Sequence, residues 1–218
     1  MKKILFNDRY RLTDAVLDGR KTMTRRIVPA NESGRHTVSA LKSSRYKQGD
    51  IVAIAQPYIH CYRDALGTLR EVSIGAIMES AGWMNKMFVC SEWMPNRIRI
   101  TKVDVERLQD ISDEDCLREG IQAVKTPYGI RYVAGGDKVP DFEVPLSVKC
   151  SFKTPREAFA ALIDRVSGKG TWADNPLVFV YSFELIKTPE PAFPPAPAQS
   201  AQKSFVAGVG FEPTTSGL

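Results

Sequence analysis

Long apolar runs are absent from this 218-residue sequence. No stretch of about 18 apolar residues occurs, so no segment is expected to span a membrane. The first residues, MKKILFNDRY, carry two lysines, but charge returns at Asp8 before an apolar region of signal-peptide length has formed. We therefore expect a cytoplasmic protein that has no membrane partner.

Cysteine and histidine are scarce and scattered. The sequence has four cysteines and two histidines, which are Cys61, Cys90, Cys116, Cys150, His36 and His60. No C-x-x-C pair occurs, and the histidines are not at the spacing of metal ligands. We expect no metal site, no cofactor and no disulfide framework.

Acidic residues are few in the first part of the chain. Residues 1–50 hold 12 of the 30 basic residues and 5 of the 25 acidic residues. Their net charge is therefore +7, and that of the remaining residues is −2. A basic balance confined to one region favours contact with phosphate or nucleic acid. The alternative is a solvated basic face with no ligand.

Hydrophobic periodicity predicts three helices and four main strands. The helices are expected at 9–19, 112–120 and 154–168, and the strands at 21–28, 51–55, 98–105 and 175–186. Gly19 and Gly120 are placed to end helices, and Ser112 and Thr154 to cap them. A slip in the alternation near Thr101 predicts a β-bulge.

The order of these elements predicts an α+β, mainly β fold, with a small β-barrel and peripheral helices. No regular alternation of strand and helix occurs, which argues against a doubly wound sheet. We expect one domain over residues 1–186, with irregular insertions near 59–90 (including a hairpin) and 121–150 (a flap or hairpin). Residues 187–218 begin with a proline-rich stretch and are expected to be a disordered tail.

The end of this tail, GVGFEPTTSGL, fits no element of the domain. The codons of Gly-Phe-Glu-Pro can contain the T-arm sequence of a tRNA gene. The hypothesis is that the reading frame runs into such a gene or its remnant. The alternative is a short interaction motif.

The stretch DGRKTMTRRI, residues 18–27, gathers four cationic side chains at one bend. Its GRKTMTRR segment fits the G-x-K-x-x-x-x-R signature of the ASCH domain family, a branch of the PUA-like superfamily of small β-barrels. Supporting matches lie at Gly49-Asp50, 94–101, 105–121 and 172–184. The chain resembles this family over roughly residues 2–186, and is similar to longer forms found in phages and prophages.

The resemblance implies two functions. Many ASCH proteins are assumed to bind RNA, and some small bacterial members are amidohydrolases that remove the acyl group from N4-acetylcytidine and related N4-acylated cytosines. Carried onto this chain, the catalytic set of those enzymes is Lys21, Thr24 and Glu119. Our leading prediction is such a hydrolase, with a modified cytosine nucleoside as substrate. The rivals are an RNA-binding module without turnover and, less favoured, a ribonuclease.

Amide hydrolysis needs a nucleophile, a proton shuttle and an oxyanion stabiliser. The arginines near Lys21 lower its pKa, which would make it a usable base. Thr24 would then be the nucleophile or would position the attacking water, and Glu119 would exchange a proton or orient Lys21. Positions 21 and 24 face opposite sides of a regular strand, so convergence requires a bend, a bulge, or Lys21 in the turn after Gly19.

Other polar and aromatic residues are candidates for holding the substrate. Arg26 could anchor a ribose or phosphate, or steady Glu119, and the whole basic cluster could instead be a phosphate-binding patch without chemistry. Gln56 stands where many longer members have a glutamate, and could hydrogen-bond a base edge. Tyr58, Tyr128 and Tyr132 are candidates for stacking on a base, whereas Trp172 and Tyr181 are expected in the core. The substrate-binding set is therefore predicted as Arg20, Arg25, Arg26, Gln56 and Tyr58.

Overall fold

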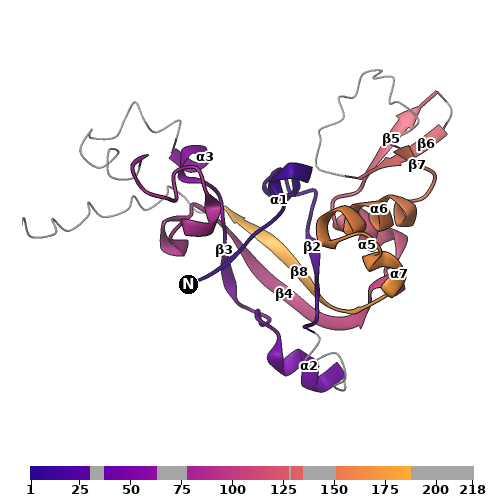
Figure 1. Ribbon diagram of the computed structural model, residues 1–218, viewed down its shortest axis with the longest axis horizontal. Helices are drawn as coiled ribbons and strands as arrows, with labels where there is room; N and C mark the ends of the chain where they lie inside the picture. Colours follow the sequence, from indigo (N-terminus) through magenta and orange to yellow (C-terminus); the bar gives the residue numbers. More distant parts are fainter. Residues whose placement is uncertain (30–36, 63–77, 128, 135–150, 188–218) are drawn as a thin grey trace, which may run out of the picture.

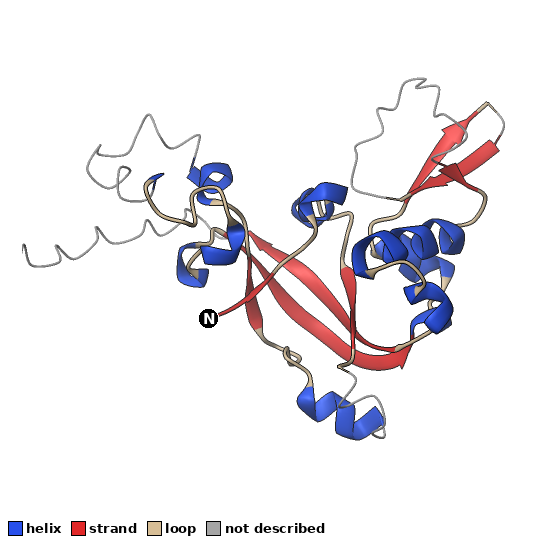
Figure 2. Cartoon of the chain, viewed as in Figure 1, coloured by secondary structure: helices blue, strands red, loops and turns tan. Residues whose placement is uncertain are grey.

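A central five-stranded sheet organises the chain in the computed structural model (Figures 1 and 2). The structure describes residues 1–29, 37–62, 78–127, 129–134 and 151–187. The strands of the sheet follow the order β1 (Lys2–Ile4), β3 (Ile51–Ile54), β4 (Asn96–Arg107), β8 (Leu177–Lys187) and β2 (Met23–Ile27). Strand β1 pairs with β3 in parallel, and the other neighbours pair antiparallel.

Strands β4 and β8 form the longest ladder of the sheet. Their register shifts between Ile100 and Lys102, which confirms the predicted bulge. Before the bulge, Ile98 and Ile100 are buried in the core, and after it Val103 and Val105 pack against the core. The inward-facing set thus changes from even to odd residue numbers at Thr101.

The sheet is open rather than a closed barrel. Among the described residues, β1 and β2 are its edges, and no backbone pairing joins them. The side chain of Arg26 on β2 spans the two edges instead, because its Nη2 donates to the Leu5 carbonyl oxygen at 2.5 Å. The predicted α+β, mainly sheet architecture is confirmed, whereas the expected barrel closure is not found.

Helices cover one end of the sheet. Around the sheet lie α1 (Leu12–Leu17), α5 (Asp113–Arg118), α6 (Pro155–Ser167) and α7 (Thr171–Asp174), with α5, α6 and α7 side by side (Figure 1). The Ser112 hydroxyl accepts from the Asp115 N–H, and the Thr154 hydroxyl accepts from the Glu157 N–H. Both predicted N-caps are confirmed.

The remaining elements are short. They are α2 (Thr37–Ser43), α3 (Tyr58–Tyr62), the 3₁₀ helices Asp8–Tyr10, Lys86–Phe88, Ser91–Trp93 and Leu108–Asp110, and a small sheet of β5 (Gln122–Thr126), β6 (Gly129–Val133) and β7 (Ser151–Phe152). Strands β5 and β6 form the hairpin expected within 121–150. The described parts of 59–90 are helical and turn-like, and residues 63–77, where the other expected hairpin would fall, lie outside the described residues. The predicted tail beyond residue 187 lies outside the described residues.

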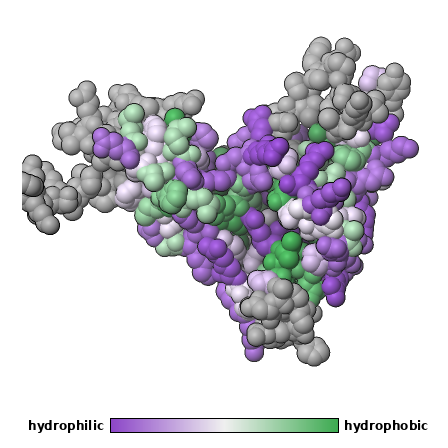
Figure 3. Space-filling view, in the orientation of Figure 1, coloured by the Kyte–Doolittle hydropathy of each residue, from purple (hydrophilic) through white to green (hydrophobic). Residues whose placement is uncertain are grey.

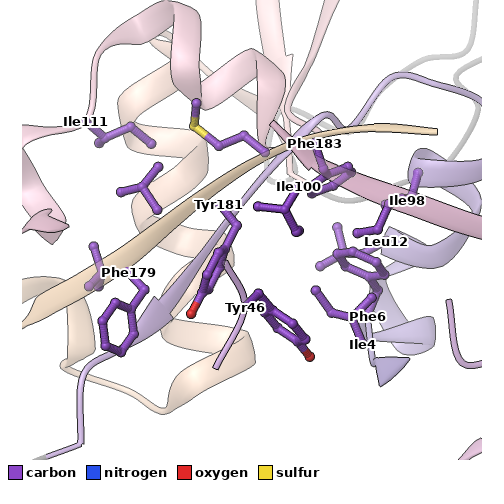
Figure 4. Close-up of a cluster of buried hydrophobic side chains, with 14 of the residues drawn as sticks. Ile4, Phe6, Leu12, Tyr46, Ile98, Ile100, Ile111, Phe179, Tyr181 and Phe183 are labelled. Carbon is purple, nitrogen blue, oxygen red and sulfur yellow. The ribbon is translucent and has the colours of Figure 1, made fainter. Parts of the chain in front are cut away.

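The main hydrophobic core packs the sheet against the N-terminal segment and against helices α1, α5 and α6. Figure 4 shows Ile4, Phe6 and Tyr46 beside Tyr181 and Ile100. Tyr181 is 1% exposed, as expected of a core residue, and Trp172 packs edge-on against Phe159. None of the described helices has the length and apolar character needed to cross a membrane.

Candidate active site

The turn after α1 positions Lys21. Gly19 adopts a φ of 75°, a conformation that favours glycine, and its N–H bonds the Val16 carbonyl to end the helix. The Lys21 N–H then donates to the Ala15 carbonyl at 2.9 Å. Lys21 therefore precedes β2, which starts at Met23, and the strand-parity objection to its meeting Thr24 does not apply.

The ammonium group of Lys21 is buried against Glu119. Its Nζ lies 2.5 Å from Glu119 Oε2 and donates to the Glu119 carbonyl oxygen at 2.8 Å. Lys21 is 2% exposed and Glu119 4%. Glu119 follows α5, where Gly120 has a φ of 101° and allows the chain to turn away beside the Lys21 stem. Two residues 98 positions apart thus form one buried pair.

Arg25 holds the other side of Glu119. Its Nη1 lies 3.2 Å from Glu119 Oε1, and its Nη2 lies 2.7 Å from Glu106 and 3.3 Å from Asp115. Three carboxylates therefore surround a guanidinium that is almost fully buried. Arg25 was predicted to bind substrate, but its guanidinium is taken up by these carboxylates and holds Glu119 in place. Steadying Glu119 was one of the alternatives considered for Arg26.

Burial lowers the pKa of Lys21 from its ordinary value of 10.5. The Glu119 carboxylate opposes this shift, and the nearby charges of Arg26 and Arg25 add to it. For Arg25, burial also acts against the charged form, but Glu119 and Glu106 outweigh it and raise its pKa. A lysine whose pKa is lowered can lose its proton more readily, while the arginine remains a permanent cation.

A cavity of about 400 Å³ opens onto this pair. Its polar lining includes Lys21, Thr24, Arg25, Arg26 and Glu119, so the structure brings all three predicted catalytic residues to one cavity. Among the described residues, no hydrogen bond engages the Thr24 hydroxyl. That hydroxyl is therefore available to a ligand.

Another part of the cavity lining is apolar. It is formed largely by one face of α6 together with α1 and β8, through Leu12, Phe159, Leu162, Ile163, Val166 and Val178. Figure 3 shows hydrophobic side chains in the hollowed middle of this face of the molecule, bordered by hydrophilic ones. The cavity thus presents a charged, reactive side and a side suited to a hydrocarbon group.

Three predicted substrate-binding residues lie elsewhere. Arg20 pairs with Asp18 at 3.2 Å and does not line the cavity. The Gln56 side-chain oxygen accepts from Asn96 at 2.8 Å. Tyr58 is 2% exposed, and its hydroxyl accepts from the Cys90 N–H at 2.7 Å. Its ring is buried in a separate hydrophobic cluster, so it offers no stacking surface at this cavity.

Sequence reasoning missed the carboxylates that hold Arg25 and the apolar wall on α6. Glu106 and Asp115 are 81 and 90 residues from Arg25, and no local pattern links residues so far apart. The α6 wall did have a signal, because Phe159, Leu162, Ile163 and Val166 recur at helical spacing. That spacing predicts the helix, but it does not show that this face lines a cavity.

Compared with protein-family models, with curated proteins and with solved structures, the chain matches none. Within the described part of the chain, no group of three or more His, Cys, Asp or Glu side chains is arranged to hold a metal ion. Function therefore has to be argued from the buried Lys21–Glu119 pair, its arginine and the cavity they line.

Proposed function

We propose that this protein is an amidohydrolase that removes the acyl group from N4-acylated cytosine nucleosides. The observation that carries the proposal is the buried Lys21–Glu119 pair beside Thr24 on a single cavity. The ASCH-like motif in residues 19–26, and the PUA-like relationship it implies, support the same assignment.

The chemistry assigned to these residues starts from the neutral amine of Lys21. As the Thr24 oxygen bonds to the acyl carbon, its proton passes to Lys21 and then to N4 of the leaving cytosine as the C–N bond breaks. Water then hydrolyses the threonine ester and releases the carboxylic acid. In the other route that these residues allow, Thr24 positions a water that attacks the acyl carbon directly.

The arginines have separate tasks in this proposal. Arg25 holds Glu119, which in turn orients the Lys21 amine and shares its proton. Arg26 lines the cavity, and its guanidinium is suited to stabilise the negative charge that develops on the carbonyl oxygen. The apolar wall on α6 would receive the hydrocarbon part of the acyl group.

The deciding experiment is incubation with N4-acetylcytidine and N4-acylcytidines of longer chain, measuring cytidine and the free acid. We expect turnover by the wild type, and a loss of kcat/KM of about a hundredfold or more in Thr24→Val. Thr101→Val, at an exposed β4 position, is the matched control and should retain the full rate. No hydrolysis across the panel, or full activity in Thr24→Val, would refute the proposal. Mass spectrometry of stalled reactions separates the two routes, since only the first leaves an acyl group on Thr24.

RNA binding without turnover is a second candidate, favoured by the +7 balance of residues 1–50. It has less support, because the carboxylates around Arg25 occupy a cation that would otherwise hold phosphate. In this case log affinity for RNA should fall linearly with log salt concentration, and Arg26→Gln should weaken binding more than Thr24→Val. An affinity that is insensitive to salt would exclude it.

A further inference from the structure

A second cavity, of about 320 Å³, adjoins the first and shares Arg26 and Ile27 with it. Its other lining residues come from β1 and the residue after it, from the end of α2, from β8 and from the segments after β2 and α2, and they are Ile4, Leu5, Pro29, Ser43, Arg45, Tyr46, Phe179 and Tyr181. Its size is at the lower end of the range typical of small-ligand sites, about 300–1,000 Å³. Apart from Arg26, none of these residues has a task in the proposed hydrolysis.

The charged groups that the described residues bring to the second cavity are all cationic, and they belong to Arg26 and Arg45. Within the described part of the chain, Arg26 donates one hydrogen bond, through Nη2 to the Leu5 carbonyl oxygen, and its guanidinium carries further N–H donors. Arg45 is exposed, with its guanidinium carbon 5.6 Å from the centre of the Tyr46 ring. The cavity is therefore suited to an anion.

Aromatic rings form much of its apolar lining. Tyr46 and Tyr181 meet edge to face with ring centres 5.2 Å apart, and Phe179 lies 6.1 Å from Tyr181 (Figure 4). The Tyr46 hydroxyl donates to the Lys3 carbonyl at 2.9 Å, and the Tyr181 and Ser44 hydroxyls are 2.8 Å apart. Burial raises the pKa of both tyrosines, so the rings remain uncharged. These contacts fix the rings as a rigid apolar surface.

We propose that the second cavity is a nucleotide-binding site, in which Arg45 and Arg26 hold a phosphate and the apolar lining of the cavity contacts the base. Guanidinium groups match the geometry of phosphate oxygens, and a largely apolar lining with a few polar groups is typical of small-ligand sites. The same chemistry fits a free mononucleotide and one nucleotide of a strand. The site does not depend on the proposed hydrolysis.

A phosphorylated tyrosine also combines an aromatic ring with a phosphate. Two observations favour the nucleotide. The cavity adjoins the one to which we assign a nucleoside. Most of its lining residues belong to residues 1–50, whose net charge of +7 suits the repeated phosphates of a strand.

Titration calorimetry on the full chain tests the site with adenosine 5′-monophosphate, adenosine, inorganic phosphate, a triadenylate and O-phosphotyrosine. Arg45→Gln should weaken binding of the monophosphate or the triadenylate about tenfold, the loss expected for one charge-assisted hydrogen bond. Arg9→Gln is the matched control, because Arg9 is also exposed and lies over a tyrosine ring, at 5.8 Å from the centre of Tyr10. Thr24→Val alters only the first cavity and should leave the affinity unchanged.

Binding of the monophosphate as tight as that of the triadenylate identifies a free nucleotide as the ligand, and binding of the triadenylate alone identifies a strand. Either result supports the site if Arg45→Gln weakens it and Arg9→Gln does not. The proposal is overturned if neither ligand binds, if Arg45→Gln has no effect, if phosphate alone binds as tightly as the nucleotide, or if phosphotyrosine binds more tightly. Because these titrations require no turnover, they test the second cavity independently of the hydrolase assignment.

Discussion

The two cavities that meet at Arg26 differ in how their charges are compensated. In the first, Lys21 and Arg25 are buried against carboxylates, and in the second, Arg26 and Arg45 face a cavity whose described lining contains none. A buried lysine held by a carboxylate can exchange a proton, whereas an arginine that faces a cavity attracts an anion. This difference agrees with the two proposals, which give proton transfer to the first cavity and the binding of an anionic ligand to the second.

The largest expected difference between the cavities is in stability. Glu119→Ala leaves Lys21 without its carboxylate and removes one of the three that surround Arg25, so the free energy of unfolding should fall by about 3 kcal/mol. Arg45→Ala in the second cavity should change it by less than about 0.5 kcal/mol, since Arg45 is exposed. Urea unfolding followed by tryptophan fluorescence measures both.

Glu114→Ala is the control for this experiment, because Glu114 is exposed on the same helix α5. It should leave the unfolding midpoint unchanged. If Glu119→Ala and Arg45→Ala lower the free energy of unfolding equally, the two cavities do not differ in the way their charges contribute to stability.

The second expected effect is on pH dependence. If the neutral amine of Lys21 is the base, kcat/KM should rise with pH through a pKa below 10.5 and then level off. The Glu119 charge raises that pKa, so Glu119→Gln should move the rising limb to lower pH. NMR titration of ¹³C-lysine-labelled protein follows the amine directly, even where the variant hydrolyses slowly.

Glu106→Gln serves as its comparison, since Glu106 contacts Arg25 but not Lys21. In Glu106→Gln, the rising limb of the pH profile of kcat/KM should stay close to that of the wild type. A limb that moves upward in Glu119→Gln would contradict the assignment of the base.

A smaller effect should appear in the choice of acyl group. Val166 on α6 lines the first cavity, so Val166→Phe should narrow it and reduce kcat/KM for longer acyl groups about tenfold relative to acetyl. Arg165→Phe places the same ring on the exposed side of the helix and should leave the ratio unchanged. Competition between two acylcytidines measures the ratio of their kcat/KM values directly. If Val166→Phe lowers kcat/KM equally for all acyl groups, α6 does not determine which acyl group is preferred.

The sequence predicted local structure well where the signal is local. The capped start of α6 at Thr154 and the bulge at Thr101 both follow from neighbouring residues, and both are confirmed. The prediction of a closed barrel was wrong. Closure depends on whether the two edge strands pair, and here the Arg26 side chain connects the edges instead. A contact of this kind leaves no periodic pattern in the sequence.

The candidate site shows the same limit. The GRKTMTRR motif pointed to Lys21 and Thr24, and the structure brings both to one cavity with Glu119. Adjacent arginines look alike in a sequence, yet Arg25 is surrounded by carboxylates and Arg26 spans the sheet edges. Their difference arises from strand parity and from partners more than 80 residues away, which the motif does not contain.

The smallest effect is expected from removing residues 188–218. Both cavities are lined by residues that precede this segment, so its deletion should leave hydrolysis and nucleotide affinity unchanged within experimental error. Steady-state kinetics and calorimetry on the shortened chain check this. A loss of either activity would show that the segment contributes to a site, and would refute the hypothesis that it is a genomic accident.

The bulge gives β4 one residue more than its pairing with β8 requires, because Ile100 and Lys102 lie opposite the consecutive residues Phe183 and Ser182. Loss of the codon for Thr101 would remove the bulge and leave Val103 and Val105 facing the core. Loss of the codon for Asp104 would instead turn Val105 away from the core and Glu106 toward it, so that Arg25 would lose one of its carboxylates. A deep mutational scan with in-frame deletions should therefore find that Thr101 tolerates deletion and Asp104 does not.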